Sequence, residues 1–177
     1  MLFSSIIFLF LFLPLTLLGY YLIPEKYKNY WLLFTSLIFF AWGGVSETVI
    51  LIISIVINYY FGIAIQKYID TKKSYLFLFW GVTINLLILG VFKYANFFVG
   101  NLNQILSVFE MPNLQQTRIA LPIGISFYTF HSLSYLVDIY KKKSTAQKNI
   151  LDLSLYICMF SQLIAGPIIR YSKSEER

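Results

Sequence analysis

The sequence predicts an all-α membrane protein, a polytopic transmembrane helical bundle with about six membrane segments. Of its 177 residues, 58% are hydrophobic and only 12% are charged, and the mean hydropathy is +0.70. Soluble domains carry about 25% charged residues, so this chain lacks the charge to cover a water-facing surface. Its apolar residues occur in runs close to the roughly 20 residues that one membrane span requires.

Three of these runs lie in the first part of the chain, at residues 2–23, 30–42 and 48–65. Pro14 lies inside the first run and predicts a kinked span, which helices in lipid tolerate. The second run is short, so it either thins the bilayer locally or breaks at Gly43 and Gly44. We expect Ser46 to cap the third helix, with Glu47 placed favourably at the positive end of the helix dipole.

Three further runs follow at residues 75–91, 119–140 and 150–165. Between the first two, residues 92–118 are mixed in character and predict an interfacial segment around 97–109. Pro122 is expected in the first turn of the next helix, where its missing N–H costs little. The last run is expected to stop at Gly166 and Pro167, because Gly-Pro interrupts a helix.

The distribution of basic residues predicts the orientation of the chain. The segments 24–29, 66–74 and 141–149 together hold nine lysines, whereas 43–47 and 92–118 together hold two basic residues. The positive-inside rule places the lysine-rich segments in the cytoplasm and therefore the N-terminus outside. The basic residues form short clusters rather than a stripe, so the net charge of +6 does not indicate a nucleic-acid partner.

The run at 119–140 carries the richest polar face. The spacing places five polar side chains on one side of the helix, namely Tyr128, His131, Ser134, Tyr135 and Asp138. His131, the single histidine, is either a general base or a neutral residue that forms a hydrogen bond between helices. Asp138 is expected to form a local ion pair with the lysines at 141–143.

Smaller polar groups predict close helix packing elsewhere. Ser54, Asn58 and Gly62 recur every four residues, and Asn85 stands in a similar position on the following run. Such stripes of small and amide side chains allow helices to approach and to form hydrogen bonds in lipid.

Two further features have two interpretations each. Lys93 either reaches to the membrane surface or contacts an anionic substrate or headgroup. Gln162 and Arg170 flank the Gly166-Pro167 break, which is either the lining of a cavity or a turn at the membrane surface. Cys158 stands alone, so no internal disulfide framework forms, and no metal-ligand spacing appears.

Four segments together resemble the membrane-bound O-acyltransferase family, in its alginate O-acetyltransferase branch. These segments are Ser36–Gly62, Gly90–Phe98, Leu121–Tyr140 and Gln162–Tyr171. The last two are the more specific, and they contain the strings Leu-Pro-Ile-Gly-Ile-Ser-Phe-Tyr-Thr-Phe-His and Gln-Leu-Ile-Ala-Gly-Pro-Ile-Ile-Arg-Tyr. The resemblance covers nearly the whole of residues 1–177.

The resemblance implies the N-terminal transmembrane part of a larger acyltransferase fold in the bacterial inner membrane. Such enzymes move acetyl groups from a cytoplasmic donor, here acetyl-CoA, to hydroxyls of an exported polysaccharide or peptidoglycan, together with extracytoplasmic partner proteins. The family's catalytic histidine lies in its second half, which this sequence does not contain. We therefore expect no catalytic residue here, no bound cofactor, and a fragment that is inactive without the missing half.

The resemblance also assigns roles to the polar residues. The residues expected to line a substrate tunnel or funnel are Lys93, Tyr128, His131, Tyr135, Gln162, Gly166, Pro167 and Arg170. The lysines at 141–143 either anchor the chain at the membrane surface or attract the phosphates of the donor. The alternative to an acyltransferase is a non-enzymatic membrane bundle, such as a small permease or an assembly subunit.

Overall fold

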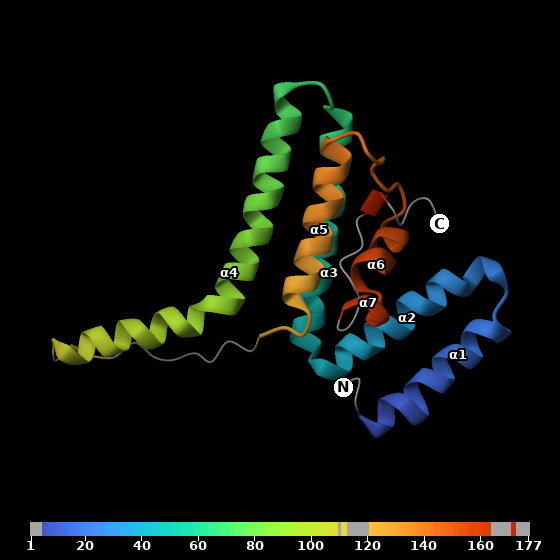
Figure 1. Ribbon diagram of the computed structural model, residues 1–177, viewed down its shortest axis with the longest axis horizontal. Coiled ribbons are helices and arrows are strands. Elements are labelled where there is room, and N and C mark those ends of the chain that lie inside the picture. Colours follow the sequence, from blue (N-terminus) through green and yellow to red (C-terminus); the bar gives the residue numbers. More distant parts are fainter. Residues whose placement is uncertain (1–4, 110, 113–120, 164–170, 173–177) are drawn as a thin grey trace.

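The protein is all-helical in the part of the chain that its computed structural model describes, which is residues 5–109, 111–112, 121–163 and 171–172 (Figure 1). The elements in chain order are η1 (Phe8–Phe12), α1 (Leu13–Leu22), α2 (Glu25–Gly43), α3 (Val45–Lys67), α4 (Lys72–Val108), α5 (Ile125–Tyr140), α6 (Ile150–Cys158) and α7 (Phe160–Leu163). The predicted all-α class is thus confirmed.

Two of the described helices, α3 and α4, are long and apolar enough to cross a membrane. The continuous helical run Phe8–Leu22 is apolar but shorter. The expected six spans are therefore not all present as long helices. In the second half of the chain, 16-residue α5 rises only about 24 Å and 9-residue α6 only about 14 Å.

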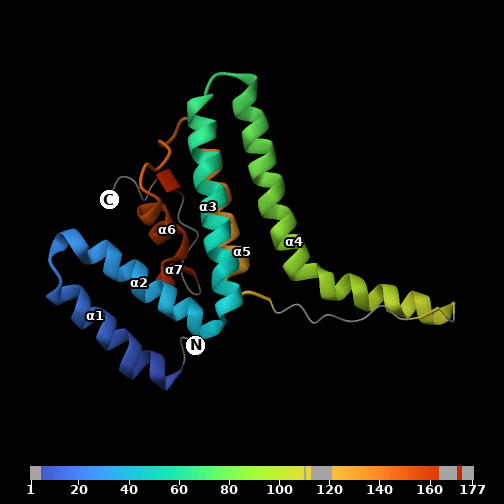
Figure 2. The ribbon, with the colours of Figure 1, turned by 180° about the vertical axis from the view of Figure 1, so that it is seen from behind.

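The first two helices lie side by side, as both views show (Figures 1 and 2). A π-helical turn, η1, precedes the start of α1, and Pro14 stands in the first turn of α1. Gly19 makes the close approach to α2 possible, because a Cβ there would lie 2.2 Å from Cζ2 of Trp31. The indole Nε1 of Trp31 donates a hydrogen bond to the carbonyl of Thr16 at 2.9 Å, which ties the two helices together.

The junction of α2 and α3 is a single residue, Gly44, in extended backbone with φ 163°. The second run was expected either to thin the bilayer or to break at Gly43 and Gly44, and the structure has the break. Helix α2 also begins earlier than expected, at Glu25. Its 19 residues give a length of about 28 Å. The expected cap at Ser46 is wrong, because α3 already begins at Val45 and no side chain caps it. Glu47 does lie in the first turn.

The fourth helix is longer than the sequence indicated. The membrane segment predicted at 75–91 lies within this helix, and α4 continues without interruption to Val108. No proline falls between residues 92 and 108 to stop it. The helix bends part-way, and its far arm extends away from α3 and α5 (Figure 1).

The helices formed by the last two predicted runs differ from those runs in their bounds. Helix α5 begins at Ile125 rather than at 119, since Gly124 at its N-cap has a left-handed backbone with φ 73°. Pro122 therefore precedes the helix instead of lying in its first turn. The run at 150–165 is broken at Met159, whose ψ of 116° is extended, into α6 and α7. The break expected at Gly166 and Pro167 lies outside the described residues.

The core forms where α3, α4 and α5 pack against one another, with α2 and α6 also packed on α3. Leu51, Ile65, Leu136 and Leu153 are fully buried there. Close approach depends on Gly62, because a Cβ at this position would lie 2.4 Å from the hydroxyl of Tyr135.

An amide pair joins α3 to α4 inside this core. Asn58 Nδ2 donates to Asn85 Oδ1 at 3.1 Å, and Asn85 Nδ2 donates back to Asn58 Oδ1 at 2.8 Å. Both side chains are almost completely buried, at 0% and 2% exposure. Each amide also donates within its own helix, to the carbonyls of Ser54 and Gly81 respectively. The stripe on α3 thus meets its partner on α4.

Candidate functional site

The polar face of α5 is turned into the protein. Tyr128, His131 and Tyr135 are spaced three and four residues apart, and each is at most 1% exposed. Polar groups away from water normally have hydrogen-bond partners, because an unpaired one costs about 1–3 kcal/mol. Their partners therefore decide whether this face is structural or a site.

Among the described residues, only one of the two ring nitrogens of His131 has a hydrogen-bond partner. Its Nδ1 lies 2.8 Å from the carbonyl oxygen of Phe127, one turn earlier in α5. A carbonyl only accepts, so Nδ1 carries the proton and Nε2 is left as an acceptor in the neutral ring. Nε2 is buried and has no partner among the described residues. The ring presents an unused acceptor to the protein interior.

Tyr128, three residues before His131, shows the same property. Its hydroxyl is buried and has no hydrogen-bond partner in the described part of the chain. A phenol can donate and accept, whereas the neutral imidazole Nε2 accepts. The two residues thus place an unused donor and an unused acceptor on one face of α5, which is what a polar ligand or a water would satisfy.

Aromatic rings extend this face toward α6 and residue 171. The ring of Tyr156, on α6, stands edge-on to His131 with 5.3 Å between centroids. Tyr171 packs against Tyr156 at 5.1 Å and against Tyr135 at 4.8 Å. Sequence reasoning did not select Tyr156 or Tyr171 as site residues. Tyr171 could have been found, because it closes the Gly-Pro-Ile-Ile-Arg-Tyr string, whereas nothing in the sequence marks Tyr156.

Asp138 lies at the far end of the same face and is buried. Its carboxylate accepts a hydrogen bond from the backbone N–H of Ser172 at 3.2 Å, and Ser134 accepts one from the N–H of Tyr171 at 3.4 Å. The expected local ion pair of Asp138 is not formed among the described residues. Lys142 pairs instead with Asp70, which the α3–α4 turn brings beside it.

Of the remaining predicted tunnel residues, the structure describes the side chain of Lys93. Lys93 is exposed on α4, with its Nζ 5.6 Å from the ring centre of Tyr94. Gln162 is described only as part of α7. The other three lie outside the described residues, namely Gly166, Pro167 and Arg170.

The described residues bring together no group of three or more His, Cys, Asp or Glu side chains that could hold a metal ion. Cys158 is fully buried, so its thiol is shielded from solutes. The side chains of the α5 face can form hydrogen bonds and pack against aromatic rings.

The chain is similar to bacterial proteins named as acetylating enzymes. It is 44% identical over 172 residues to the probable alginate O-acetylase AlgI of Pseudomonas aeruginosa, a match that covers 97% of this chain and 33% of that protein. The predicted resemblance to the alginate O-acetylases is confirmed. The protein of the same name from Azotobacter vinelandii is 43% identical, with 97% of this chain and 34% of that protein covered.

A relative named for a different polymer is also similar to this chain. The peptidoglycan O-acetyltransferase of Helicobacter pylori is 32% identical over 202 residues, with 98% of this chain and 38% of that protein covered. The chain thus spans about a third of the length of the curated relatives it matches. No family model matches the chain, and no solved structure matches it either.

Proposed function

We propose that this chain is part of a membrane O-acyltransferase that transfers acetyl groups to hydroxyls of an exported polysaccharide, either an alginate-like polymer or peptidoglycan. The observation that carries the proposal is the 44% identity to an alginate O-acetylase over 97% of the chain. Acetyl-CoA on the cytoplasmic side is the proposed donor. Extracytoplasmic polysaccharide-modifying proteins are the proposed partners on the outer side.

In this proposal the chain crosses the bacterial inner membrane about six times, with its N-terminus outside. The nine lysines in alternate segments support this orientation. The shorter helices cross together with neighbouring helices or locally thinned lipid. The catalytic base is a histidine in the half of the enzyme that this sequence does not include, and it activates the acceptor hydroxyl.

The residues of this chain orient the substrate rather than make or break bonds. The unpaired acceptor of His131 and the unpaired hydroxyl of Tyr128 support a lining role, because both are buried and both lack a partner among the described residues. Tyr135, Tyr156 and Tyr171 supply the aromatic wall beside them.

Acetyl ester on the exported polymer tests this division of roles, measured in cells that carry variants of the intact gene. His131→Gln keeps a polar group and is expected to retain transfer within about tenfold of the natural protein. Loss of a general base lowers the rate of transfer about 100-fold or more. A loss of that size in His131→Gln, at equal protein amount, would show that His131 is the base.

The lining role is tested by two further variants. Tyr128→Phe removes only the hydroxyl. We expect it to lower transfer about five- to tenfold, which corresponds to the loss of one hydrogen bond to the substrate. Tyr75→Phe is the matched control, because Tyr75 is 59% exposed on α4. Equal transfer by the two variants would contradict the lining role, and no acetyl transfer by the natural gene product would contradict the proposed function itself.

A further inference from the structure

Two lysine-rich turns come together at one end of the helices. They are residues 66–74, which include the end of α3, the turn after it and the start of α4, and residues 141–149, between α5 and α6. The backbone N–H of Ala146 donates to Gln66 Oε1 at 2.6 Å, and Lys142 forms an ion pair with Asp70. These contacts join segments far apart in the sequence into one surface.

This surface carries the whole charge excess of the chain. The two turns hold seven lysines and one acidic residue, Asp70, so their formal charge is +6, which equals the net charge of all 177 residues. All seven lysines are exposed. A cluster of one sign beside an apolar helix bundle produces a positive potential that concentrates anions from solution.

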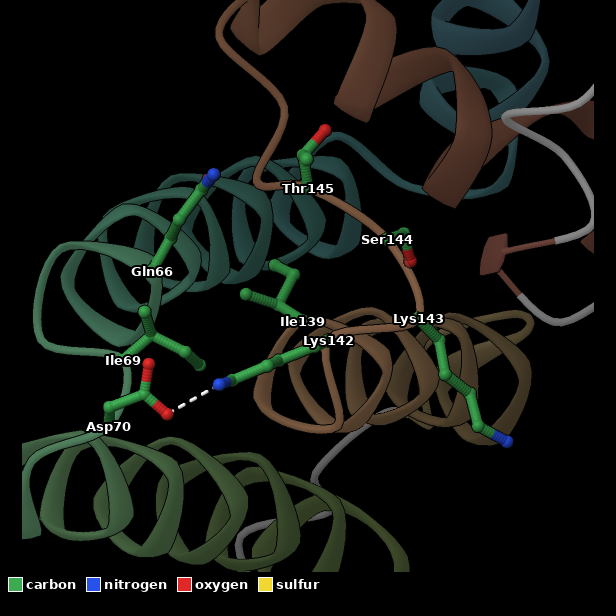
Figure 3. A pocket seen from close by; sticks show the side chains of 8 residues that line it. All are labelled: Gln66, Ile69, Asp70, Ile139, Lys142, Lys143, Ser144 and Thr145. Carbon is green, nitrogen blue, oxygen red and sulfur yellow. Dashed lines mark hydrogen bonds and ion pairs between the residues drawn. The ribbon is translucent and has the colours of Figure 1, made fainter.

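A pocket of about 480 Å³ opens within this surface, between the ends of α3 and α5 (Figure 3). Its volume lies in the range of small-molecule sites, roughly 300–1,000 Å³. Lys142 and Asp70 face each other across it, whereas Lys143 points away from them (Figure 3). The hydroxyl oxygen of Ser144, which also lines the pocket, is buried and has no partner within the described ranges.

Both partners of the ion pair have an unusual backbone conformation. Asp70 has a φ of 72° and Lys142 a φ of 57°, and these are the two non-glycine residues with positive φ in the described structure. Positive φ is uncommon for residues other than glycine. The ion pair at the pocket thus joins one such residue from each turn.

We propose that this pocket binds a phosphate group, with Lys142 as the cation and the Ser144 hydroxyl as a donor. Lysine binds phosphate as a point charge, and a hydrogen bond between ionised groups is about twice as strong as a neutral one. Asp70 forms an ion pair with the ammonium group of Lys142 in the free protein. Phosphate and the Asp70 carboxylate therefore compete for this ammonium group. The phosphate comes from an anionic phospholipid headgroup or from a soluble phosphate ester.

The competition predicts variants with opposite effects. Lys142→Asn removes the cation, and Asp70→Asn frees it; asparagine tolerates positive φ, so both turns are retained. We expect Lys142→Asn to weaken phosphate binding about tenfold, the weight of one hydrogen bond to a charged group, and Asp70→Asn to strengthen it by a similar factor. Lys26→Asn removes an exposed lysine from the start of α2 and is expected to leave phosphate binding unchanged.

The protein is purified as its gene encodes it and placed in nanodiscs. One arm compares phosphatidylglycerol with phosphatidylcholine by counting retained lipid in native mass spectrometry. The other titrates adenosine 3′,5′-bisphosphate into phosphatidylcholine nanodiscs by isothermal calorimetry. Selective retention of phosphatidylglycerol identifies the lipid source, whereas binding of the nucleotide identifies a soluble one.

The proposal is overturned if neither probe binds, or if Lys142→Asn and Asp70→Asn bind both probes as the natural protein does. Should Lys142→Asn fail to fold by far-ultraviolet circular dichroism, the gain expected for Asp70→Asn decides alone. Neither arm measures acetyl transfer, so this proposal and the proposed function fail independently.

Discussion

The amide pair between α3 and α4 allows a direct measurement of what holds these helices together. Replacing Asn58, Asn85 or both by alanine forms a double-mutant cycle, which isolates the energy of the pair from the cost of each cavity. Two interhelical hydrogen bonds of 3.1 and 2.8 Å are lost together. Interhelical bonds in membrane proteins average about 0.6 kcal/mol, so the expected coupling energy is about 1.2 kcal/mol.

Each single variant is expected to cost more than this coupling. Asn58→Ala also removes the bond to the Ser54 carbonyl and leaves Asn85 Oδ1 buried without its donor. An unsatisfied buried group costs about 1–3 kcal/mol. Once one amide has been removed, removal of the other adds less than it would alone, and that difference is the coupling.

Unfolding by sodium dodecyl sulfate in mixed micelles, followed by far-ultraviolet circular dichroism, gives the four free energies of unfolding. Asn58→Ala combined with Asn101→Ala is the control cycle, because Asn101 is exposed and bonds within its own helix to Phe97. That control should be additive. A coupling energy below about 0.5 kcal/mol for Asn58 and Asn85 would refute the reasoning, because the effects of mutations at independent sites deviate from additivity by up to that amount.

Three further outcomes are expected. Gly62→Ala places a Cβ 2.4 Å from the Tyr135 hydroxyl and should lower the free energy of unfolding by about 1–3 kcal/mol in the same assay. Gly124→Ala should cost about 1–2 kcal/mol, because φ at Gly124 is 73°; no change would mean that this turn relaxes. The arm of α4 should lie at the membrane surface. The emission of an environment-sensitive fluorophore attached at Phe98→Cys should therefore shift to the blue when vesicles are present. The emission of the same fluorophore at Ser107→Cys should not shift, because nine residues place this position on the opposite face of the helix. The single native cysteine is buried, so the introduced thiol is the one labelled, and equal spectra at both positions would contradict the surface placement.

Hydrophobic runs were enough to predict the helical class and most helix positions. They work because a backbone in lipid must satisfy its own hydrogen bonds, which leaves few conformations besides the helix. The four-residue spacing of Ser54, Asn58 and Gly62 likewise predicted a packing face, since positions four apart share one side of a helix. That Asn58 would meet Asn85 in particular depends on how far α3 and α4 slide along each other, which spacing within one helix does not specify.

The break between α6 and α7 was not predictable from the same pattern. Met159 breaks the run at 150–165 although methionine is a good helix former, so the break results from tertiary packing rather than from local propensity. The candidate site was partly predictable, because the face with Tyr128 and His131 follows from helical periodicity. Tyr156 belongs to another helix, and only the fold brings it to His131.

The attachment of residues 171–172 to α5 has a consequence for how this region tolerates sequence change. Both hydrogen bonds run from backbone N–H groups of Tyr171 and Ser172 to the side chains of Ser134 and Asp138. The donors exist whatever side chain stands at 172, proline excepted, whereas the acceptors require an oxygen at fixed positions on α5. Substitutions at Ser172 should therefore be neutral, and the constraint on this attachment should fall on a helix more than thirty positions earlier.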